Sequence, residues 1–483
     1  MTILLINPPQ YYPLGEEPII TFPLGLGYLS SILSKFNFNH KVNDYFVKYL
    51  KTKIKYKNGI IYGKDPNEIK EEIKIIKPKI ILITCQSSSQ YFIVENIVNI
   101  IKKTLPTCNI IIGGNHVSSE YENILNNKNI DFLVIGEGEK TIITIIKNIY
   151  NKKKLKNVKG IGYRLNNNKI INPSLNNIKN LNKIPFPAWN KFPIKTYLKT
   201  KKSNSLLPYQ GKTIQIITSR GCPYNCSFCA TQKISGSKWR SRSVENIITE
   251  IRTLKKKYNI QNIEFVDDNI ALDSKRFKLL LNELKKEKIK WCVPNGICTN
   301  HLNKKLIRQM KNSGCYALFL PIETGNNKIK KLFSNKKLSK KHILKIINFT
   351  KKIKLYVVGF FIIGFQEETK KDIIKTINFI KKLNLDEIQV SILTPLPGSK
   401  LFQKHQNLIN NFDELTAKEV NIQSNYLSNK KIKKLRNKAY IDFELNKLIN
   451  NPGSYLNKFQ LQRIWRYVKY FIISHKKNEI YYK

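Results

Sequence analysis

Short runs of aliphatic and β-branched residues alternate with longer amphipathic segments along the first 150 residues of this 483-residue chain. The intervening segments, such as Leu26–Ser34 and Asn96–Lys103, repeat their apolar residues at the spacing of a helix. Strands that alternate with helices form βαβ units, so residues 1–150 predict an α/β domain with a Rossmann-like, doubly wound parallel sheet. The predicted strands are Ile3–Ile6, His40–Tyr45, Lys79–Thr84, Asn109–Ile112 and Asp131–Ile135.

The pattern changes over residues 151–207, which predict a hairpin and a linker. The runs Gly160–Arg164 and Lys169–Pro173 flank the turn LNNN, and prolines punctuate Ile184–Trp189. Residues 208–424 then predict a partial (β/α)6 barrel of the TIM type, with a Ser243 N-cap at its first helix and its chemistry at the carboxyl ends of the strands. Its six strands are predicted at Thr213–Thr218, Asn262–Val266, Lys290–Pro294, Ala317–Ile322, Leu355–Ile363 and Glu387–Leu393.

Residues 425–483 predict a basic, helical C-terminal region. Within it, Arg463–Lys477 mixes aromatic and β-branched residues with Lys and Arg, so a helix docked on the barrel is expected, with peripheral membrane contact as the alternative. No apolar run approaches the ~20 residues that span a bilayer, and the N-terminus has neither the basic region nor the cleavage site of a signal peptide. A cytoplasmic protein is therefore expected.

The formal net charge of +52 raises the question of nucleic-acid binding. Lys supplies most of the positive charge, whereas Arg, which is better suited to bidentate recognition of nucleic acid, is scarce. The charge is also spread along the chain instead of gathering in one tract. A Lys-rich composition with a solvated surface explains the charge better than a dedicated nucleic-acid site.

Three of the eight cysteines lie close together in RGCPYNCSFCA, with the spacing Cys222-x3-Cys226-x2-Cys229. A zinc site needs a fourth ligand nearby, and the nearest histidines in the sequence are distant. Eight cysteines in so long a chain do not form a disulfide scaffold, and a redox dithiol has only a C-x-x-C pair. The motif follows the first barrel strand, which places it at the expected catalytic end.

Three thiolates can bind three irons of a [4Fe–4S] cluster and leave the fourth iron open to a small molecule. S-adenosylmethionine offers an amine and a carboxylate to such an iron, together with a C–S bond that one electron can cleave. The expected product is a 5′-deoxyadenosyl radical, which abstracts hydrogen from unactivated carbon.

The cysteine stretch resembles the cluster motif of radical S-adenosylmethionine enzymes. The wider set of motifs is similar to that of the cobalamin-binding branch of this superfamily, which includes class B methyltransferases. The motifs in the barrel are TSRGCPYNCSFC, KWRSRS, FVDDN, IETG, FFIIGFQEET and ILTPLPGS, and those in the first domain are NPP, PLGLGYLSSIL, GGNH and GEGE.

The resemblance implies that Cys222, Cys226 and Cys229 bind the cluster. It also implies contacts with S-adenosylmethionine, in which carboxylates hold the methionyl amine or the ribose hydroxyls and glycine allows close backbone approach. Arg240 and Arg242 would face the methionyl carboxylate or cobalamin side chains, and a surface ion pair is the alternative role for either. The implied contacts are Phe228, Arg240, Asp267, Asp268, Glu323, Gly364 and Thr394.

The resemblance further implies cobalamin (B12) at the carboxyl edge of the first sheet. The loop at 7–18 contains no His, so the corrin is expected without a protein His ligand on its lower face. For His116, a purely structural role is the alternative. The implied contacts are Asn7, Pro9, Thr84, Gln86, Ser88, Gly113, Gly114, His116, Gly136 and Glu137.

The function implied is methylation of an unactivated carbon in a small-molecule substrate, with flavodoxin or ferredoxin as electron donor. Three alternatives remain: a cobalamin-dependent cyclase similar to anaerobic porphyrin cyclases, a tRNA methylthiotransferase, and a non-catalytic nucleic-acid-binding protein. Methylthiotransferases carry additional cysteines for a second cluster, and Cys85 and Cys108 are too few for one. The sequence identifies neither the substrate nor a catalytic residue.

Overall fold

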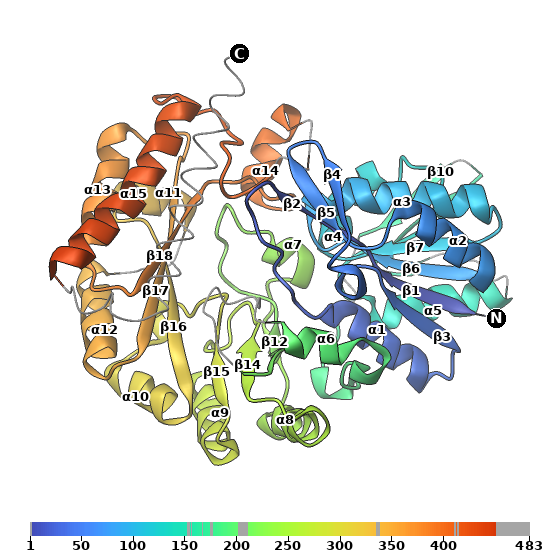
Figure 1. Ribbon diagram of the computed structural model, residues 1–483, viewed down its shortest axis with the longest axis horizontal. Helices are drawn as coiled ribbons and strands as arrows, with labels where there is room; N and C mark the ends of the chain where they lie inside the picture. The colour runs from blue at the N-terminus through green and yellow to red at the C-terminus, as the bar shows by residue number, and fades with distance from the viewer. Residues whose placement is uncertain are drawn as a thin grey trace.

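A computed structural model describes residues 2–450, except for 152–154, 156, 167, 174–176, 201–210, 335–338, 410–411 and 413–414. Two α/β units lie side by side in Figure 1, the N-terminal unit in blue and cyan and the second unit in green to red. In these ranges, no helix is both long and apolar enough to cross a membrane. The predicted helix at 463–477 falls outside the described residues.

The N-terminal unit is built on a seven-stranded sheet with the order β10-β9-β8-β7-β6-β1-β3. Neighbours from β3 to β8 pair in parallel, which confirms the predicted doubly wound sheet. The predicted hairpin, β9–β10, joins β8 antiparallel and so extends this sheet. The strands are β1 (Ile3–Asn7), β3 (His40–Asp44), β6 (Ile80–Thr84), β7 (Asn109–Gly113), β8 (Phe132–Val134), β9 (Ile161–Leu165) and β10 (Asn168–Asn172).

Alternating side chains of these strands fill two cores, because successive residues of a strand point to opposite faces. Leu4 and Ile6 of β1 pack into the core that contains α2 and α3 residues, whereas Ile3 and Leu5 pack with residues of α1 and α5. The sheet is therefore covered on both faces, as a parallel sheet requires. The helices are α1 (Leu24–Lys35), α2 (Pro66–Ile76), α3 (Tyr91–Thr104), α4 (Asn115–Ile124) and α5 (Gly138–Asn151).

A small antiparallel sheet, β2-β5-β4, was not predicted. It comprises β2 (Gln10–Pro13), β5 (Gly59–Tyr62) and β4 (Lys53–Tyr56). β2 follows β1 after Pro8 and Pro9, and the Gln90 side chain holds it through bonds to both the amide (2.6 Å) and the carbonyl (2.9 Å) of Tyr11. This sheet places the loop after β1 beside the carboxyl edge of the main sheet.

The connector packs the two units into one continuous hydrophobic core. Trp189 lies 4.3 Å from Phe22 between ring centroids, and both belong to a buried cluster that continues into Ile214 and Ile216 of the second unit. The connector carries the short helix α6 (Ile194–Lys199). A shared core of this kind favours a fixed relative placement of the units.

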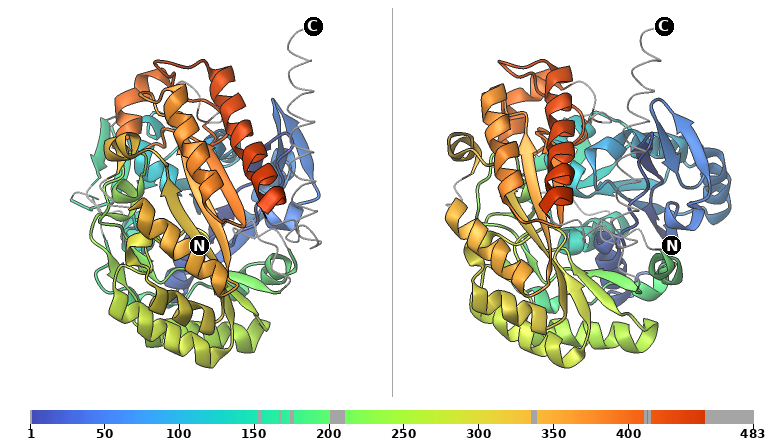
Figure 2. Two further views of the ribbon diagram at one scale, coloured as in Figure 1. Left: turned by 90° about the vertical axis from the view of Figure 1, so that its left-hand side faces the viewer. Right: turned by 60° about the vertical axis from the view of Figure 1, so that its left-hand side comes forward.

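The second unit is the predicted six-stranded partial barrel. Its strands are parallel and in sequential order, β11-β14-β15-β16-β17-β18, and the sheet is open between β11 and β18. Figure 2 shows helices covering the outer side of this curved sheet. The strands are β11 (Thr213–Ile216), β14 (Asn262–Phe265), β15 (Lys290–Cys292), β16 (Cys315–Glu323), β17 (Tyr356–Ile363) and β18 (Glu387–Ile392).

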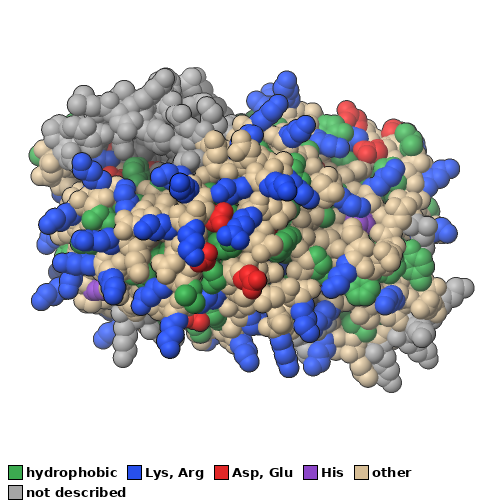
Figure 3. All heavy atoms as spheres, turned by 90° about the horizontal axis from the view of Figure 1, so that it is seen from below, with side chains coloured by type: hydrophobic (Ala, Val, Ile, Leu, Met, Phe, Trp, Pro, Cys, Tyr) green, Lys and Arg blue, Asp and Glu red, His purple; other side chains and the backbone are tan. Residues whose placement is uncertain are grey.

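Helix α8 begins as predicted, since the Ser243 side chain caps the amide of Asn246 at 3.2 Å. The longer helices of this unit are α8 (Val244–Tyr258), α9 (Ser274–Glu287), α10 (Lys304–Asn312), α12 (Lys340–Lys352), α13 (Lys370–Lys382) and α15 (Asn429–Asn450). Short helices α7 (Thr231–Ser235), α11 (Asn327–Phe333) and α14 (Lys400–His405) lie in the loops. Lys and Arg side chains are spread over the face in Figure 3 and do not gather in one patch.

Candidate active site

All three motif cysteines lie on one loop that begins and ends at a two-residue ribbon. β12 (Ser219–Arg220) pairs antiparallel with β13 (Arg240–Ser241), so Arg220 lies directly opposite Arg240. We call residues 221–239 the cysteine loop. Gly221 begins it with a φ of 87°, and a Cβ at this position would lie 2.6 Å from the Lys238 carbonyl oxygen. Closure of the loop therefore requires glycine here.

The loop holds the three cysteines without disulfides. The Cys229 amide donates to the Cys226 carbonyl at 3.1 Å, and the Cys222 amide donates to the Gly236 carbonyl at 3.2 Å. Cys226 is buried, and the other two are partly exposed. Among the described residues, no three Cys, His, Asp or Glu side chains converge on a site for one ion. In a [4Fe–4S] cluster each thiolate binds a different iron. The three cysteines therefore need to lie on one loop but do not need to converge on the position of a single ion.

The two predicted aspartates, Asp267 and Asp268, accept hydrogen bonds from residues at or just before the start of the cysteine loop. Asp267 is completely buried and accepts hydrogen bonds from the hydroxyls of Thr218 (2.7 Å) and Ser219. Burial raises the pKa of Asp267, and the hydroxyl donors oppose that shift. Asp268 reaches the loop itself, where it accepts from the Gly221 amide at 3.3 Å. Asp267 thus fixes the junction of strand and loop, and Asp268 lies beside the loop.

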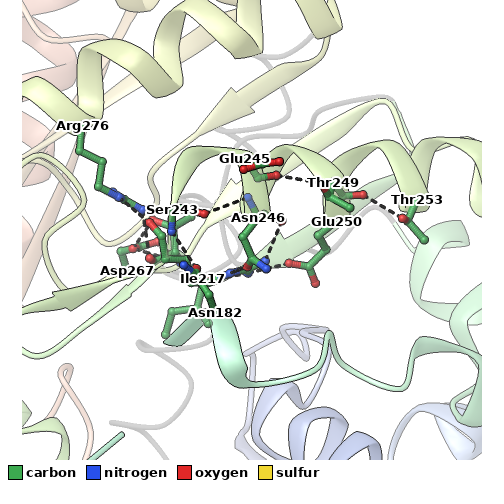
Figure 4. A network of polar contacts seen from close by, with 12 residues as sticks. Asn182, Ile217, Ser243, Glu245, Asn246, Thr249, Glu250, Thr253, Asp267 and Arg276 are labelled. Carbon is green, nitrogen blue, oxygen red and sulfur yellow. Dashed lines mark hydrogen bonds and ion pairs between the residues drawn. The ribbon is translucent and has the colours of Figure 1, made fainter. Parts of the chain in front are cut away.

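A second polar network holds the start of α8 against this junction. Arg276 donates to the Thr218 carbonyl at 3.0 Å, and Arg242 forms a 2.6 Å ion pair with Glu250. Figure 4 shows Arg276 and Asp267 on one side of Ser243 and Glu250 on the other. Arg242 therefore has the ion-pair role that was its alternative, although the pair is buried.

Phe228 faces an apolar cluster at the carboxyl ends of β17 and β18. Its ring lies 5.5 Å from that of Phe333, which in turn stacks on Phe365 at 4.3 Å. Gly364, with a φ of 86°, precedes Phe365. Phe228 and Gly364, both implied contacts of S-adenosylmethionine, are therefore brought to the same region of the barrel mouth.

Glu368 is a residue of this region that the sequence analysis did not single out. Its carboxyl group accepts from the amides of Gly364 (2.7 Å) and Phe365 (3.2 Å), and its second oxygen has no partner within the described part of the chain. Burial raises the pKa of Glu368 to about 8. The signal was present in the quoted motif FFIIGFQEET, as an acidic residue just after the glycine at a strand end.

Two further predicted residues of the barrel, Glu323 and Thr394, lie at the same mouth. Glu323 ends β16 in the left-handed region, with a φ of 69°. Thr394 follows β18, and its hydroxyl donates to the Thr416 carbonyl at 3.0 Å. Near Glu323, burial lowers the pKa of Lys330 to about 8. Contacts of these residues with S-adenosylmethionine remain predictions.

A cavity of about 230 Å3 opens at the carboxyl edge of the N-terminal sheet, and we call it the tail cavity because the resemblance implies that the nucleotide tail of cobalamin lies beside Gly113 and Gly114. Its walls come from the ends of β6, β7 and β8, from α1 and the start of α5, and from Arg220, Ile234 and Ser235 near or within the cysteine loop. The two α/β units therefore enclose one space. The implied cobalamin contacts that line it are Thr84, Gln86, Gly113, Gly114, Gly136 and Glu137.

A larger cavity of about 560 Å3, the central cavity, lies between the N-terminal sheet edge, β2 and the barrel. Asn7 and Gln86 line one side, and Gln215, Val266 and Thr416 line the other. Both cavities share Leu24, Gly25, Thr84 and Gln86. Asn7 and Thr84 end β1 and β6, the strands between which the sheet order changes direction, where ligands of doubly wound sheets bind.

Three implied cobalamin contacts, Pro9, Ser88 and His116, are not among the residues that line either cavity. His116 is buried between the rings of Tyr91 (4.9 Å) and Phe412 (5.0 Å), and its Nδ1 shares a 2.9 Å hydrogen bond with the Ser88 hydroxyl. Burial lowers the pKa of His116 to about 4, so the imidazole is neutral at pH 7. These surroundings are those of a packed core residue.

Arg240 contacts the N-terminal unit. Its guanidinium pairs with Glu137 at 2.7 Å and donates to the Ile178 carbonyl at 2.8 Å. Two residues that the sequence analysis placed on different cofactors are therefore joined directly. Their contacts with S-adenosylmethionine and cobalamin remain predictions.

Two family models match the chain. The model of the radical SAM superfamily matches residues 216–380, and that of the B12 binding domain matches residues 19–146. An uncharacterised methyltransferase of Pyrococcus horikoshii is 30% identical over 453 residues, which cover 92% of this chain and 93% of that protein. The chain belongs to the cobalamin-binding radical S-adenosylmethionine enzymes.

Matches to other members of this enzyme family also extend over most of the chain. Cytidylyl-2-hydroxyethylphosphonate methyltransferase of Streptomyces wedmorensis is 28% identical, over 75% of this chain and 72% of that protein. An anaerobic magnesium-protoporphyrin IX monomethyl ester cyclase of Rubrivivax gelatinosus is 24% identical, over 86% and 71%. Among solved structures, the cobalamin-dependent radical enzyme OxsB, with aqua-cobalamin and S-adenosylmethionine bound, has the same fold, with a TM-score of 0.70 at 18% identity over 98% of this chain and 72% of that one.

The residues of this radical S-adenosylmethionine enzyme fit the cofactors of its family: a [4Fe–4S] cluster, S-adenosylmethionine and cobalamin. Three thiols share one loop, and that loop meets a cavity at the carboxyl edge of a B12-binding sheet, beside the ends of β6, β7 and β8. Gly113 and Gly114 form part of that cavity, and Gly114 has a φ of 116° at which a Cβ would lie 2.4 Å from the Cys85 carbonyl oxygen, so the backbone of this wall requires glycine.

Proposed function

We propose that this enzyme methylates an unactivated carbon of a small molecule that binds between the barrel mouth and the N-terminal sheet. When bound, the cluster supplies an electron that cleaves S-adenosylmethionine, and cobalamin carries the methyl group. The observation that carries the proposal is the common space of the two units: the central cavity is lined from both, and the tail cavity is lined by both the B12-type sheet and the cysteine loop.

In this proposal Cys222, Cys226 and Cys229 hold the cluster, and the rest of the loop's geometry serves to present them. The backbone closure at Gly221 and the Asp268 carboxylate fix the start of the loop. Phe228, with Glu323, Gly364 and Thr394 at the strand ends, forms the surface on which S-adenosylmethionine would lie.

The central cavity has a mixed lining, which favours a substrate with both an apolar part and polar groups. Tyr11, Tyr12, Phe22 and Leu415 are among the residues that line it, and Glu16 at its border forms a 2.7 Å ion pair with Lys418 from the barrel unit.

The reductant is proposed to be an acidic one-electron carrier such as flavodoxin or ferredoxin. A surface with net charge +52 attracts an acidic partner and speeds its association. Such a partner and the absence of a membrane-spanning helix from the described residues agree with a place in the cytoplasm. Nucleic acid is not proposed as the substrate.

The test is anaerobic reconstitution with iron, sulfide and hydroxocobalamin, followed by incubation with labelled S-adenosylmethionine and a reductant. The expected result is close to four irons and one cobalamin per chain, with formation of 5′-deoxyadenosine. With the correct substrate, a methylated product and S-adenosylhomocysteine are expected. Ring closure without label transfer would instead identify a cyclase.

Cys226→Ala is expected to lose the cluster and to abolish cleavage of S-adenosylmethionine. Cys108→Ala is the matched control, because Cys108 is also buried but lies in the N-terminal unit away from the cysteine loop. Cleavage that persists in Cys226→Ala, at an iron content equal to that of the control, would contradict the assignment of the cluster ligands.

A further inference from the structure

The base of the cysteine loop places two positive charges on one rung of a ribbon. Arg220 and Arg240 are directly paired residues of β12 and β13, at the two ends of the segment that carries the motif cysteines. Like charges directly opposite each other on paired strands are destabilising. Arg240 is also buried and Arg220 nearly so, with 7% and 12% of their side chains exposed. An arrangement of this kind persists only if other groups neutralise it.

The neutralising groups come from the N-terminal unit. Glu139 accepts from Arg220 at 2.7 Å, and Glu137 pairs with Arg240 at 2.7 Å and lies 3.6 Å from Arg220. Although burial alone raises the pKa of Glu139, the Arg220 guanidinium outweighs it and holds that pKa below its ordinary value. The Arg220 guanidinium also lies 5.2 Å from the ring centre of Tyr28 on α1. The two arginines of the barrel unit are therefore neutralised by two glutamates of the N-terminal unit.

The same acidic residues form part of the wall of the tail cavity. Glu137 and Glu139 flank Gly138, at the start of α5, and all three line the cavity together with Arg220. One side of this ion-pair cluster therefore faces the tail cavity, which is assigned to cobalamin, and the other side carries the ends of the loop that holds the cysteines.

We propose that Glu137, Glu139, Arg220 and Arg240 form an interdomain clamp that couples occupancy of the cobalamin cavity to the order of the cysteine loop. They are positioning residues: the clamp fixes the ends of the loop, and a ligand in the cavity restrains Glu137 and Glu139 and so restrains both arginines. The inference rests on the cobalamin and cluster assignments, because it concerns how the two sites act on each other.

Hydrogen exchange of the full-length protein tests the clamp directly. Backbone amides of residues 221–239 are followed in the metal-free protein, with and without hydroxocobalamin as the probe. The expected result is that hydroxocobalamin slows their exchange about tenfold or more in the unmodified protein, and that this protection is largely lost in Glu139→Gln. Glu283→Gln, which removes the acidic partner of a surface pair with Lys286, is the matched control and should behave as the unmodified protein.

Two further variants separate the clamp from simple misfolding. Glu139→Asp keeps the charge and should restore part of the protection. Arg220→Gln combined with Glu139→Gln removes one charge of each sign, and the two effects should be non-additive. A loop whose exchange is the same in all variants, or hydroxocobalamin protection that Glu139→Gln leaves intact, would overturn the proposal.

The result also distinguishes the clamp from the cofactor assignment. If hydroxocobalamin does not bind the unmodified protein, as measured by its absorbance after gel filtration, the cobalamin assignment fails. The clamp is then tested without the cofactor, since Glu139→Gln should still speed exchange in residues 221–239 relative to Glu283→Gln. In reconstituted protein, the variant should also change the electron paramagnetic resonance signal of the reduced cluster.

Discussion

Replacement of Glu368 by Gln is expected to stabilise the protein at neutral pH. The Glu368 side chain is completely buried, and burial raises its pKa from 4.5 to about 8. Between these two values the folded protein keeps a proton that the unfolded chain releases. The free energy of unfolding is therefore highest below pH 4.5 and falls as the pH rises toward 8. Gln resembles the protonated carboxyl group and has no proton to lose, so the variant avoids this fall.

The size of the effect follows from the difference between the pKa of Glu368 in the unfolded chain and its pKa in the folded protein. One pKa unit corresponds to about 1.4 kcal/mol, and pH 7 lies about 2.5 units above the unfolded value. The unmodified carboxyl therefore lowers the free energy of unfolding by about 3 kcal/mol at pH 7, but by less than about 1 kcal/mol at pH 5. The carbonyl oxygen of Gln can still accept from the amides of Gly364 and Phe365, so the strand end keeps its support.

The assay is urea unfolding of the metal-free protein at pH 5 and pH 7, followed by tryptophan fluorescence. Glu367→Gln is the matched control, because its side chain is exposed and adjacent in sequence. A gain for Glu368→Gln that grows by about 2 kcal/mol between the two pH values, with no change in the control, is the expected result. An equal effect at both pH values, or a loss of stability at pH 7, would show that Glu368 is ionised in the folded protein and refute the reasoning.

Two further substitutions test the support of the cysteine loop. Gly221→Ala should prevent the cysteine loop from closing, since the new Cβ would lie 2.6 Å from the Lys238 carbonyl oxygen at a φ of 87°. The measurement is the amount of iron bound per chain after reconstitution. Full iron loading of the variant would contradict the loop geometry. Glu250→Ala leaves the buried Arg242 guanidinium without its ion-pair partner and should lower the free energy of unfolding by about 3–5 kcal/mol. The control Glu245→Ala, at an exposed position of the same helix, should change it by less than about 0.5 kcal/mol. Equal unfolding midpoints in urea for the two variants would show that the buried pair does not stabilise the fold.

The main sheets could be predicted because their strands are fully buried. The run at Ile3–Ile6 is continuously apolar, as expected for a parallel strand covered on both faces, and β14 is buried along its whole length although it includes Asn262 and Glu264. The small sheet β2-β5-β4 was missed because its strands have four residues each and are only partly buried. The dipeptide Asn58-Gly59 is a hairpin signal that would have located two of its strands, although the turn itself is Lys57-Asn58 and Gly59 begins β5.

The cysteines of the site could be predicted because their spacing is local, whereas their surroundings depend on contacts between distant parts of the chain. Glu137, for example, pairs with Arg240 across 103 residues of sequence, and Tyr11 is held by Gln90 across 79 residues. Motif matching placed Arg240 on S-adenosylmethionine and Glu137 on cobalamin. Their mutual contact follows only from the way in which the second unit docks on the first.

The scarcity of arginine in this chain carries more information than its total charge. Where positive charge needs only to be solvated, Lys serves, and the Lys and Arg side chains of the face in Figure 3 are spread over it. Arginine is retained where a planar, weakly hydrated group must bind several acceptors in a buried place. Arg220, Arg240, Arg242 and Arg276 all lie at the base of the cysteine loop, each with 12% or less of its surface exposed. Arg252 is exposed, so the rule is a tendency, but in a lysine-rich chain the positions of the arginines indicate where the buried polar networks lie.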